Sequence, residues 1–168
     1  MNGNRSVLAD TELSGMILGL SLRTRPEEIY RAWIEATAFG TRMILEQFEE
    51  NGLTVRSITA AGGIAKKDEM LMQIYADVTG KEISVSGAAE ATALGSAIYA
   101  ATAAGIYPSL TDAAAAMSAK IVRTYSPDEA NRKIYDRLYG EYKTLHDYFG
   151  RGGNDVMMRL REMKPQVL

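Results

Sequence analysis

The residues best suited to chemistry lie at a glycine turn between a β-branched run and a segment typical of a helix. Val55 to Ala61 leads into Gly62 and Gly63, and Ile64-Ala65-Lys66-Lys67-Asp68 follows. Glycine lacks a Cβ, so the main chain can approach a bulky ligand, and N–H groups at a helix start favour phosphate oxygens. This order predicts backbone contact with an anionic ligand. A plain tight turn is the alternative, because such turns often use glycine for geometry alone.

The two lysines and the single histidine are weaker candidates. Lys66 and Lys67 could approach phosphate oxygens as mobile charges, although lysines at a helix start are usually only solvated. His146 has no cysteine and no second histidine with which to share a metal. We therefore predict a structural or surface role for His146 and name no metal ligand.

Several polar residues are better explained by packing than by catalysis. Glu35 and Arg42 are seven residues apart on one predicted helix, about two turns, so they lie near the same face. A buried hydrogen-bonding role is the simpler interpretation for both. Tyr135, Tyr139 and Tyr142 recur at helical spacing, which predicts packing rather than stacking of a ligand.

Composition excludes several classes of partner. The 168 residues are enough for one domain with a core, and 19 basic against 21 acidic residues give a formal charge of −2 without long runs. Nucleic acid binding needs clustered Lys and Arg, so we expect none. The absence of cysteine excludes disulfides and fits the cytoplasm. The longest apolar stretch is interrupted by Gly95 and Gly105, so we expect no membrane contact.

The elements that position the glycine turn follow from periodicity and capping signals. Thr24-Arg25-Pro26-Glu27 has the form of a capping box and predicts a helix to about Glu50, with a buried stripe from Ile29 through Trp33 to Phe48. The remaining elements are predicted as a possible strand at 16–20, a strand before the glycine turn, a helix at 68–79, a strand at 81–85, and helices at 91–104, 109–119, 126–149 (with Pro127 at its first position) and 155–163.

This balance is helix-dominated, with two or three strands. So few strands are unlikely to make a complete sheet, which predicts an open strand edge and exposed apolar surface. Self-association through that edge is therefore an expected hazard.

Several segments resemble the FGGY carbohydrate kinases, members of the actin-like ATPase superfamily. Gly62-Gly63-Ile64-Ala65 followed by 71–78 looks like their adenosine motif. Segment 15–20 followed by 28–35 is similar to their second signature, and it departs at Trp33, where the family prefers a small or aliphatic residue. Segments 2–6, 35–42 and 145–150 are most like the branch that phosphorylates ribulose. The resemblance covers nearly the whole chain.

The resemblance implies an α/β fold, a ribonuclease H-like (actin-like ATPase) domain that is partial. Residues 1–168 would be a fragment of the C-terminal, ATP-binding half, without the N-terminal sugar-binding domain and the first strands. The implied reaction of the parent enzyme is transfer of a phosphoryl group from ATP to ribulose, with Mg²⁺. Sugar would bind only with the absent domain. No residue here matches the family's aspartate base, so we name no catalytic residue and expect the isolated chain to be inactive.

The resemblance also implies roles at the turn. Gly62 and Gly63 would lie against the phosphates and ribose of ATP, with Lys66 and Lys67 near the phosphates. Asp68 stands where relatives commonly carry asparagine near the adenine. An amide can donate to a ring nitrogen and an ionised carboxylate cannot, so adenine recognition would differ. Glu90, Ala93 and Gly95 resemble the segment that closes the far side of the nucleotide cleft; close helix packing is their simpler role.

Two other hypotheses stay open. The chain could be a non-catalytic helical module that dimerises through its open sheet edge and binds no nucleotide. It could also come from an FGGY kinase of different specificity, such as a xylulokinase or glycerol kinase relative.

Overall fold

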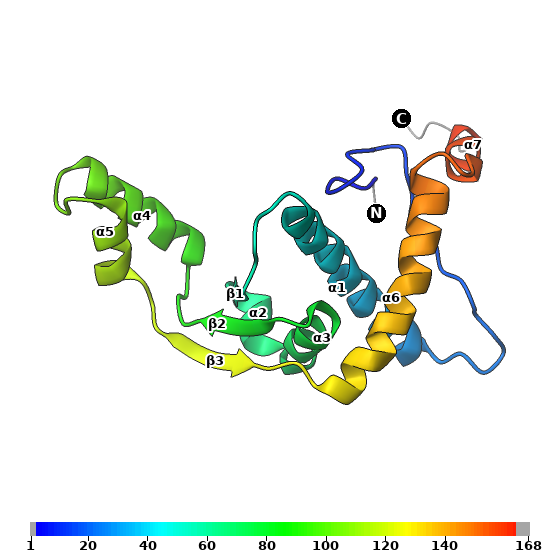
Figure 1. Cartoon of the computed structure of the whole chain (residues 1–168), viewed down its shortest axis with the longest axis horizontal. Coiled ribbons are helices and arrows are strands. Elements are labelled where there is room, and N and C mark those ends of the chain that lie inside the picture. The colour runs from blue at the N-terminus through cyan, green and yellow to red at the C-terminus, as the bar shows by residue number, and fades with distance from the viewer. Residues whose placement is uncertain (1–2, 164–168) are drawn as a thin grey trace. The chain divides into compact units, whose positions relative to one another are not determined.

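The computed structural model describes residues 3–163, which fold as two compact units. Of the described residues, 3–55 together with 129–163 form one unit, and Arg56–Asp128 form the other. The elements, in chain order, are α1 Pro26–Glu50, β1 Ser57–Ala60, α2 Gly63–Lys67, α3 Glu69–Thr79, β2 Glu82–Ser86, α4 Ala91–Ala103, α5 Leu110–Met117, β3 Ile121–Tyr125, α6 Glu129–Gly150 and α7 Val156–Glu162 (Figure 1).

Helix α1 begins one residue later than the predicted capping box requires. A residue before proline is held extended, so Arg25, with φ −97° and ψ 153°, takes the cap position before Pro26. The Glu28 carboxylate accepts a hydrogen bond from the Arg25 N–H at 2.8 Å. The predicted pairing of Thr24 with Glu27 is therefore wrong; Thr24 Oγ1 instead accepts from the Ser21 N–H at 2.9 Å.

The core of the first unit lies between α1 and α6. The Phe39 ring packs against three tyrosines of α6, with centroid distances of 6.1 Å to Tyr135, 5.9 Å to Tyr139 and 5.3 Å to Tyr142. The predicted stripe through Trp33 is wrong, because Trp33 is 49% exposed. Helix α1 carries apolar residues on two adjacent faces, one with Trp33 and one with Phe39. The tyrosines of α6 cover the face with Phe39. The residues buried on α1 are Ile34, Ala38, Phe39 and Met43.

The second unit is built on a three-stranded sheet in the order β1-β2-β3. Strand β1 pairs parallel with β2, and β2 pairs antiparallel with β3. Ile58 lies opposite Ile83, so apolar side chains line up on one face. The core cluster formed there contains Ala65, Met72, Ala76, Ile83 and Val85. The prediction of a helix-dominated α/β fold with few strands is confirmed.

Several ends and elements differ from expectation. Helix α3 ends at Thr79, as predicted, and Gly80 follows it in the left-handed conformation, with φ 63°. Strand β2 begins and ends one residue later than the predicted strand at 81–85. Strand β3 and the short helix α2 were not predicted. Residues 16–20 form no strand.

The first turn of α6 is also later than predicted. The helix begins at Glu129 rather than at Pro127. The Asp128 N–H donates instead to Asp77 Oδ1 at 2.8 Å, a partner 51 residues away. Asp77 is only 2% exposed. A long-range hydrogen bond therefore sets the start of this helix.

Candidate functional site

The glycine turn leaves the main chain open after β1. Gly62 has φ 102° and ψ 176°, a conformation that side-chain-bearing residues rarely adopt, and it is the N-cap residue of α2. A Cβ added at Gly62 or at Gly63 would meet no atom within 4 Å. Packing therefore does not explain the glycine pair. The backbone conformation at Gly62 explains why a glycine occupies that position. The open space beside Gly63 leaves room for a ligand.

The two lysines that follow differ in their surroundings. Lys66 Nζ donates to the Gly87 carbonyl at 2.9 Å, which ties α2 to the loop after β2. Lys67 is exposed in the last turn of α2. Lys66 is thus already oriented by the protein, whereas Lys67 projects into solvent.

Asp68 has a structural contact of its own. It is the N-cap residue of α3, and its Oδ1 accepts a hydrogen bond from the Leu71 N–H at 2.9 Å. Such a cap stabilises a helix by about 1 kcal/mol. One carboxylate oxygen of Asp68 is therefore engaged at the start of the helix.

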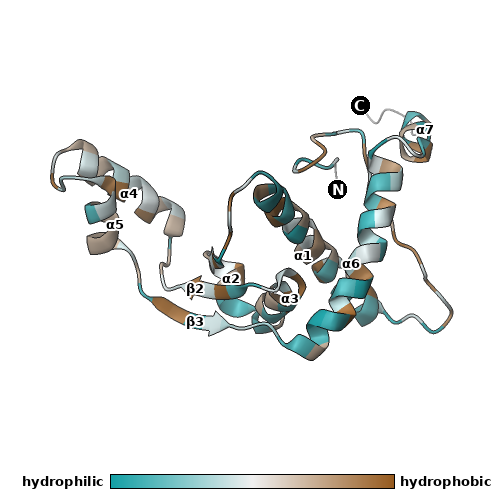
Figure 2. Cartoon of the chain, viewed as in Figure 1, coloured by the Kyte–Doolittle hydropathy of each residue, from teal (hydrophilic) through white to brown (hydrophobic). Residues whose placement is uncertain are grey.

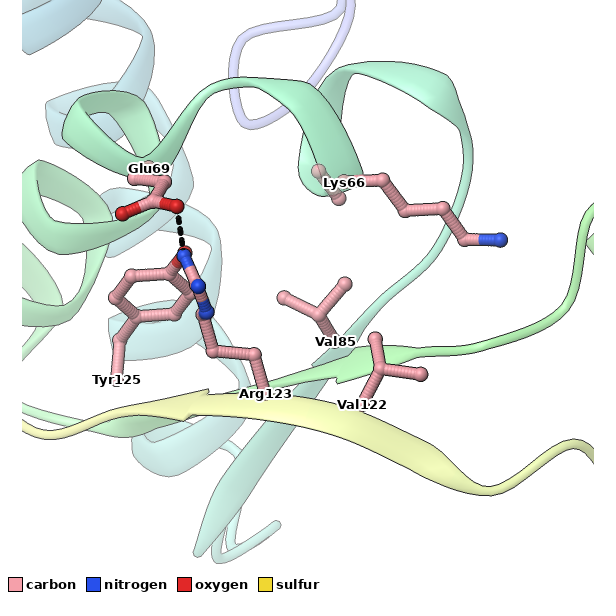
Figure 3. Close-up of a pocket in the computed structure, with 7 residues that line it drawn as sticks. Lys66, Glu69, Val85, Val122, Arg123 and Tyr125 are labelled. Atoms are coloured by element: carbon pink, nitrogen blue, oxygen red, sulfur yellow. Dashed lines mark hydrogen bonds and ion pairs between the residues drawn. The ribbon is translucent and has the colours of Figure 1, made fainter.

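A cavity of about 320 Å³ lies between α2, α3 and the β2–β3 pair (Figure 3). Arg123 crosses it to form an ion pair with Glu69, and its Nη1 donates to the Tyr125 hydroxyl at 3.3 Å. The hydrogen bond to Tyr125 has the larger effect on the pKa of Arg123 and the hydrogen bond to Glu69 the next largest, and both raise this pKa above its ordinary value. The cavity is lined by Ala65, Lys66, Glu69, Val85, Val122, Arg123 and Tyr125.

Of the predicted site residues, Lys66 lines this cavity. Arg123 and Tyr125 were missed by sequence reasoning because they lie on a strand that was not recognised. The β-branched and aromatic residues of the segment Ile121–Tyr125 were the local signal that could have found them.

Glu35 and Arg42 make hydrogen bonds, as predicted, but both side chains are half-buried rather than buried. Glu35 Oε1 accepts from Arg31 Nε at 2.8 Å and from the Tyr135 hydroxyl at 3.0 Å. Arg42 Nη1 donates to Asp136 Oδ1 at 2.6 Å. Both residues thus lie on the face of α1 that contacts α6, and the prediction that they share a face is confirmed.

His146 is held by residues of its own unit. Its Nε2 lies 3.1 Å from Asn4 Nδ2, and its Nδ1 lies 3.0 Å from Asp147 Oδ1. The hydrogen bond from His146, with help from Arg151, lowers the pKa of Asp147. This arrangement is the structural role that was predicted for the histidine.

Within residues 3–163, no cluster of three or more His, Cys, Asp or Glu could hold a metal ion. In the same part of the chain, no helix has the length and apolar character needed to cross a membrane.

Residues 1–104 match the FGGY family of carbohydrate kinases, C-terminal domain. The chain therefore belongs to the FGGY carbohydrate kinase family. Within it, the chain is 53% identical over 167 residues to a ribulokinase of Halalkalibacterium halodurans, a match that covers 97% of this chain and 30% of that protein. The chain thus spans about a third of the length of the curated relatives it matches.

Solved structures share the fold. The xylulose kinase of Rhodospirillum rubrum is 28% identical, with a TM-score of 0.68 over 79% of this chain and 27% of that one. The Plasmodium falciparum glycerol kinase, whose structure contains ADP, is 22% identical, with a TM-score of 0.65 over 85% of this chain and 29% of that one. A nucleotide thus binds to a protein that shares this fold.

Proposed function

We propose that this chain supplies the ATP-binding, C-terminal portion of a kinase that phosphorylates ribulose. The observation that carries the proposal is the open glycine pair, Gly62 and Gly63, in a chain that is 53% identical to a ribulokinase. Ribulose is favoured over other sugars because identity to the xylulose kinase structure is only 28%. ATP would be the phosphoryl donor, and the parent enzyme would act in the cytoplasm.

Each residue of the turn has a distinct role in this proposal. The main chain at Gly62 and Gly63 contacts the phosphates and ribose, because no Cβ blocks that side. Lys66, oriented by Gly87, and the solvent-facing Lys67 attract the phosphate charge. Asp68 contributes mainly by capping α3, since its carboxylate cannot donate to a ring nitrogen. We therefore expect base recognition to rely on shape and stacking more than on hydrogen bonding.

Catalysis requires more than a nucleotide site. Phosphoryl transfer to a sugar hydroxyl requires a base for its proton, and Mg²⁺ beside the transferred phosphate. Among the described residues, no cluster of three or more His, Cys, Asp or Glu could hold a metal ion. The turn positions a nucleotide and does not remove a proton. We therefore propose that the isolated chain binds nucleotide weakly and does not turn over.

The test is the melting temperature of the chain with Mg·ATP, compared between wild type and two glycine variants. With ATP at about ten times Kd, binding stabilises the folded state by about 1.4 kcal/mol, or roughly 5 °C. Gly63→Val places a side chain in open space and should abolish this shift with little change in the ligand-free melt.

Gly62→Ala is the control for backbone strain. Its φ of 102° would cost an alanine about 1–3 kcal/mol, so the ligand-free melt should fall. An equal ATP shift in wild type and Gly63→Val would contradict the proposed contact. No shift in wild type at millimolar ATP would contradict nucleotide binding by the chain alone.

A further inference from the structure

The cavity between α2, α3 and the β2–β3 pair carries two cations and one anion (Figure 3). Lys66 and Arg123 supply the positive charges and Glu69 supplies the negative charge, so the lining has one positive charge in excess. The cavity volume, about 320 Å³, lies within the range of about 300–1,000 Å³ that is typical of small-molecule sites. Gly62 and Gly63 do not line the cavity, so it is separate from the open side of the glycine turn.

The floor between the two cations is apolar. Figure 3 shows Val85 and Val122 between Lys66 and Arg123. Val122 is 62% exposed, and Figure 2 shows the start of its strand, β3, in brown. Covering apolar surface that faces water with an apolar group is favourable. The cavity therefore offers an apolar contact as well as charge.

Both cations are oriented by the protein, and both keep further donors. Lys66 Nζ donates to the Gly87 carbonyl at 2.9 Å, and an ammonium group has three donors. Arg123 Nη1 makes both the bond to the Tyr125 hydroxyl and the ion pair with Glu69. A guanidinium has five N–H donors in a planar fork, so Arg123 retains donors for a second oxyanion.

Glu69 determines which oxyanion fits this cavity best. The ion pair of Arg123 with Glu69 is exposed, with 51% and 67% of the two side chains accessible, and water screens such pairs strongly. An incoming carboxylate can therefore share Arg123 with Glu69 or replace Glu69. A phosphate dianion would bring twice the charge close to the Glu69 carboxylate, and only one excess positive charge would offset it. The charge balance favours a monoanion.

We propose that this cavity binds a small carboxylate with an apolar body. The Arg123 guanidinium donates to the carboxylate, Lys66 adds positive charge on the opposite side, and the apolar body covers Val122 and the Tyr125 ring. This inference goes beyond the proposed function and does not depend on it, because the ligand is not a nucleotide and the glycine pair does not line the cavity.

Benzoate is the probe, and NMR of the full chain is the measurement. Titration with benzoate should shift the backbone amide signals of Ala65, Val85 and Val122 in a saturable manner, because an aromatic ring changes the magnetic environment of nearby nuclei. Benzyl alcohol has the same ring without the charge, and inorganic phosphate has charge without the ring. Both should bind at least about 10-fold more weakly than benzoate.

Three variants separate binding from folding. Arg123→Gln keeps a polar side chain but removes the charge, so it should weaken benzoate binding about 10-fold or more. Glu69→Gln removes the competing carboxylate and should tighten benzoate binding about 3-fold or more, a result that loss of folding cannot produce. Arg56→Gln is the matched control. It removes an exposed arginine of the same unit that does not line the cavity, so benzoate affinity should stay unchanged.

Several results would overturn the proposal. One is the absence of saturable shifts at these amides in a folded chain. Another is equal affinity for benzyl alcohol or for inorganic phosphate, which would remove the need for the charge or for the apolar body. A third is benzoate affinity that Arg123→Gln or Glu69→Gln leaves unchanged. The melting shift with Mg·ATP reports the proposed function separately, so its absence while benzoate still binds would contradict only nucleotide binding.

Discussion

Substitution of Asp77 should test how buried hydrogen bonds contribute to the stability of the second unit. Asp77 is the buried charged side chain, 2% exposed, and its Oδ1 accepts from Gln73 Nε2 at 2.7 Å and from the Asp128 N–H at 2.8 Å. Gln73 Nε2 also donates to the Ser126 carbonyl at 2.9 Å. Together these bonds fix the segment between β3 and α6 against α3.

The magnitude follows from the number of bonds lost. Asp77→Ala leaves the Asp128 N–H without its acceptor, which costs about 1–3 kcal/mol, whereas Gln73 Nε2 keeps the Ser126 carbonyl as an acceptor. We expect Asp77→Ala to lower the free energy of unfolding by about 2 kcal/mol. Asp77→Asn keeps one acceptor oxygen and loses only the charge, so we expect about 1 kcal/mol. Glu82→Ala, which replaces an exposed acid of the same unit, should change stability by less than about 0.5 kcal/mol.

Urea unfolding followed by circular dichroism gives these free energies, and hydrogen exchange of the 120–130 region locates the effect. The Asp128 amide should exchange faster in Asp77→Ala than in Asp77→Asn. Equal stability of the two variants, with unchanged protection of that amide, would refute the proposed role of Asp77.

Two further predictions concern Glu46 and Gly80. Burial raises the pKa of Glu46, but hydrogen bonds from Tyr139 and Lys143 outweigh burial and lower it below its ordinary value. A lowered pKa stabilises the fold above the ordinary pKa and loses that effect as the pH falls through the lowered value. Urea unfolding at acidic and neutral pH should therefore show a smaller acid loss for Glu46→Gln than for wild type; identical pH profiles would contradict this. Gly80→Ala places a side chain at φ 63°, so thermal melting should report a loss of about 1 kcal/mol, and no loss would argue against the left-handed cap.

The C-terminal ends of α1 and α3 agree with the sequence prediction of helices that end at about Glu50 and at residue 79. Gly52 and Gly80, which follow these ends, both have positive φ, a conformation that only glycine takes without cost. The spacing of Glu35 and Arg42 correctly placed both on one face of α1, which the structure shows in contact with α6. Each of these features depends on a few neighbouring residues, so the sequence contains the information.

Features that depend on distant residues were missed. The start of α6 depends on Asp77, 51 residues before Asp128, and no local pattern shows that bond. Strand β3 was missed because its sequence, Ile121 to Tyr125, does not alternate between apolar and polar residues, and four of its five residues are exposed. For the same reason the contacts of Arg123 with Glu69 and Tyr125 could not be foreseen. The glycine turn, by contrast, was recognisable because its chemistry lies within one continuous segment.

The most direct test of the assignment is activity in a full-length setting. The matched segment of the Halalkalibacterium halodurans ribulokinase is replaced by this chain, and ATP-dependent phosphorylation is measured with ribulose, xylulose and glycerol. We predict phosphorylation that favours ribulose and falls about 10-fold or more with Gly63→Val, a loss of at least about 1.4 kcal/mol of transition-state stabilisation. A folded hybrid that phosphorylates none of the sugars, or that keeps full activity with Gly63→Val, would contradict the account.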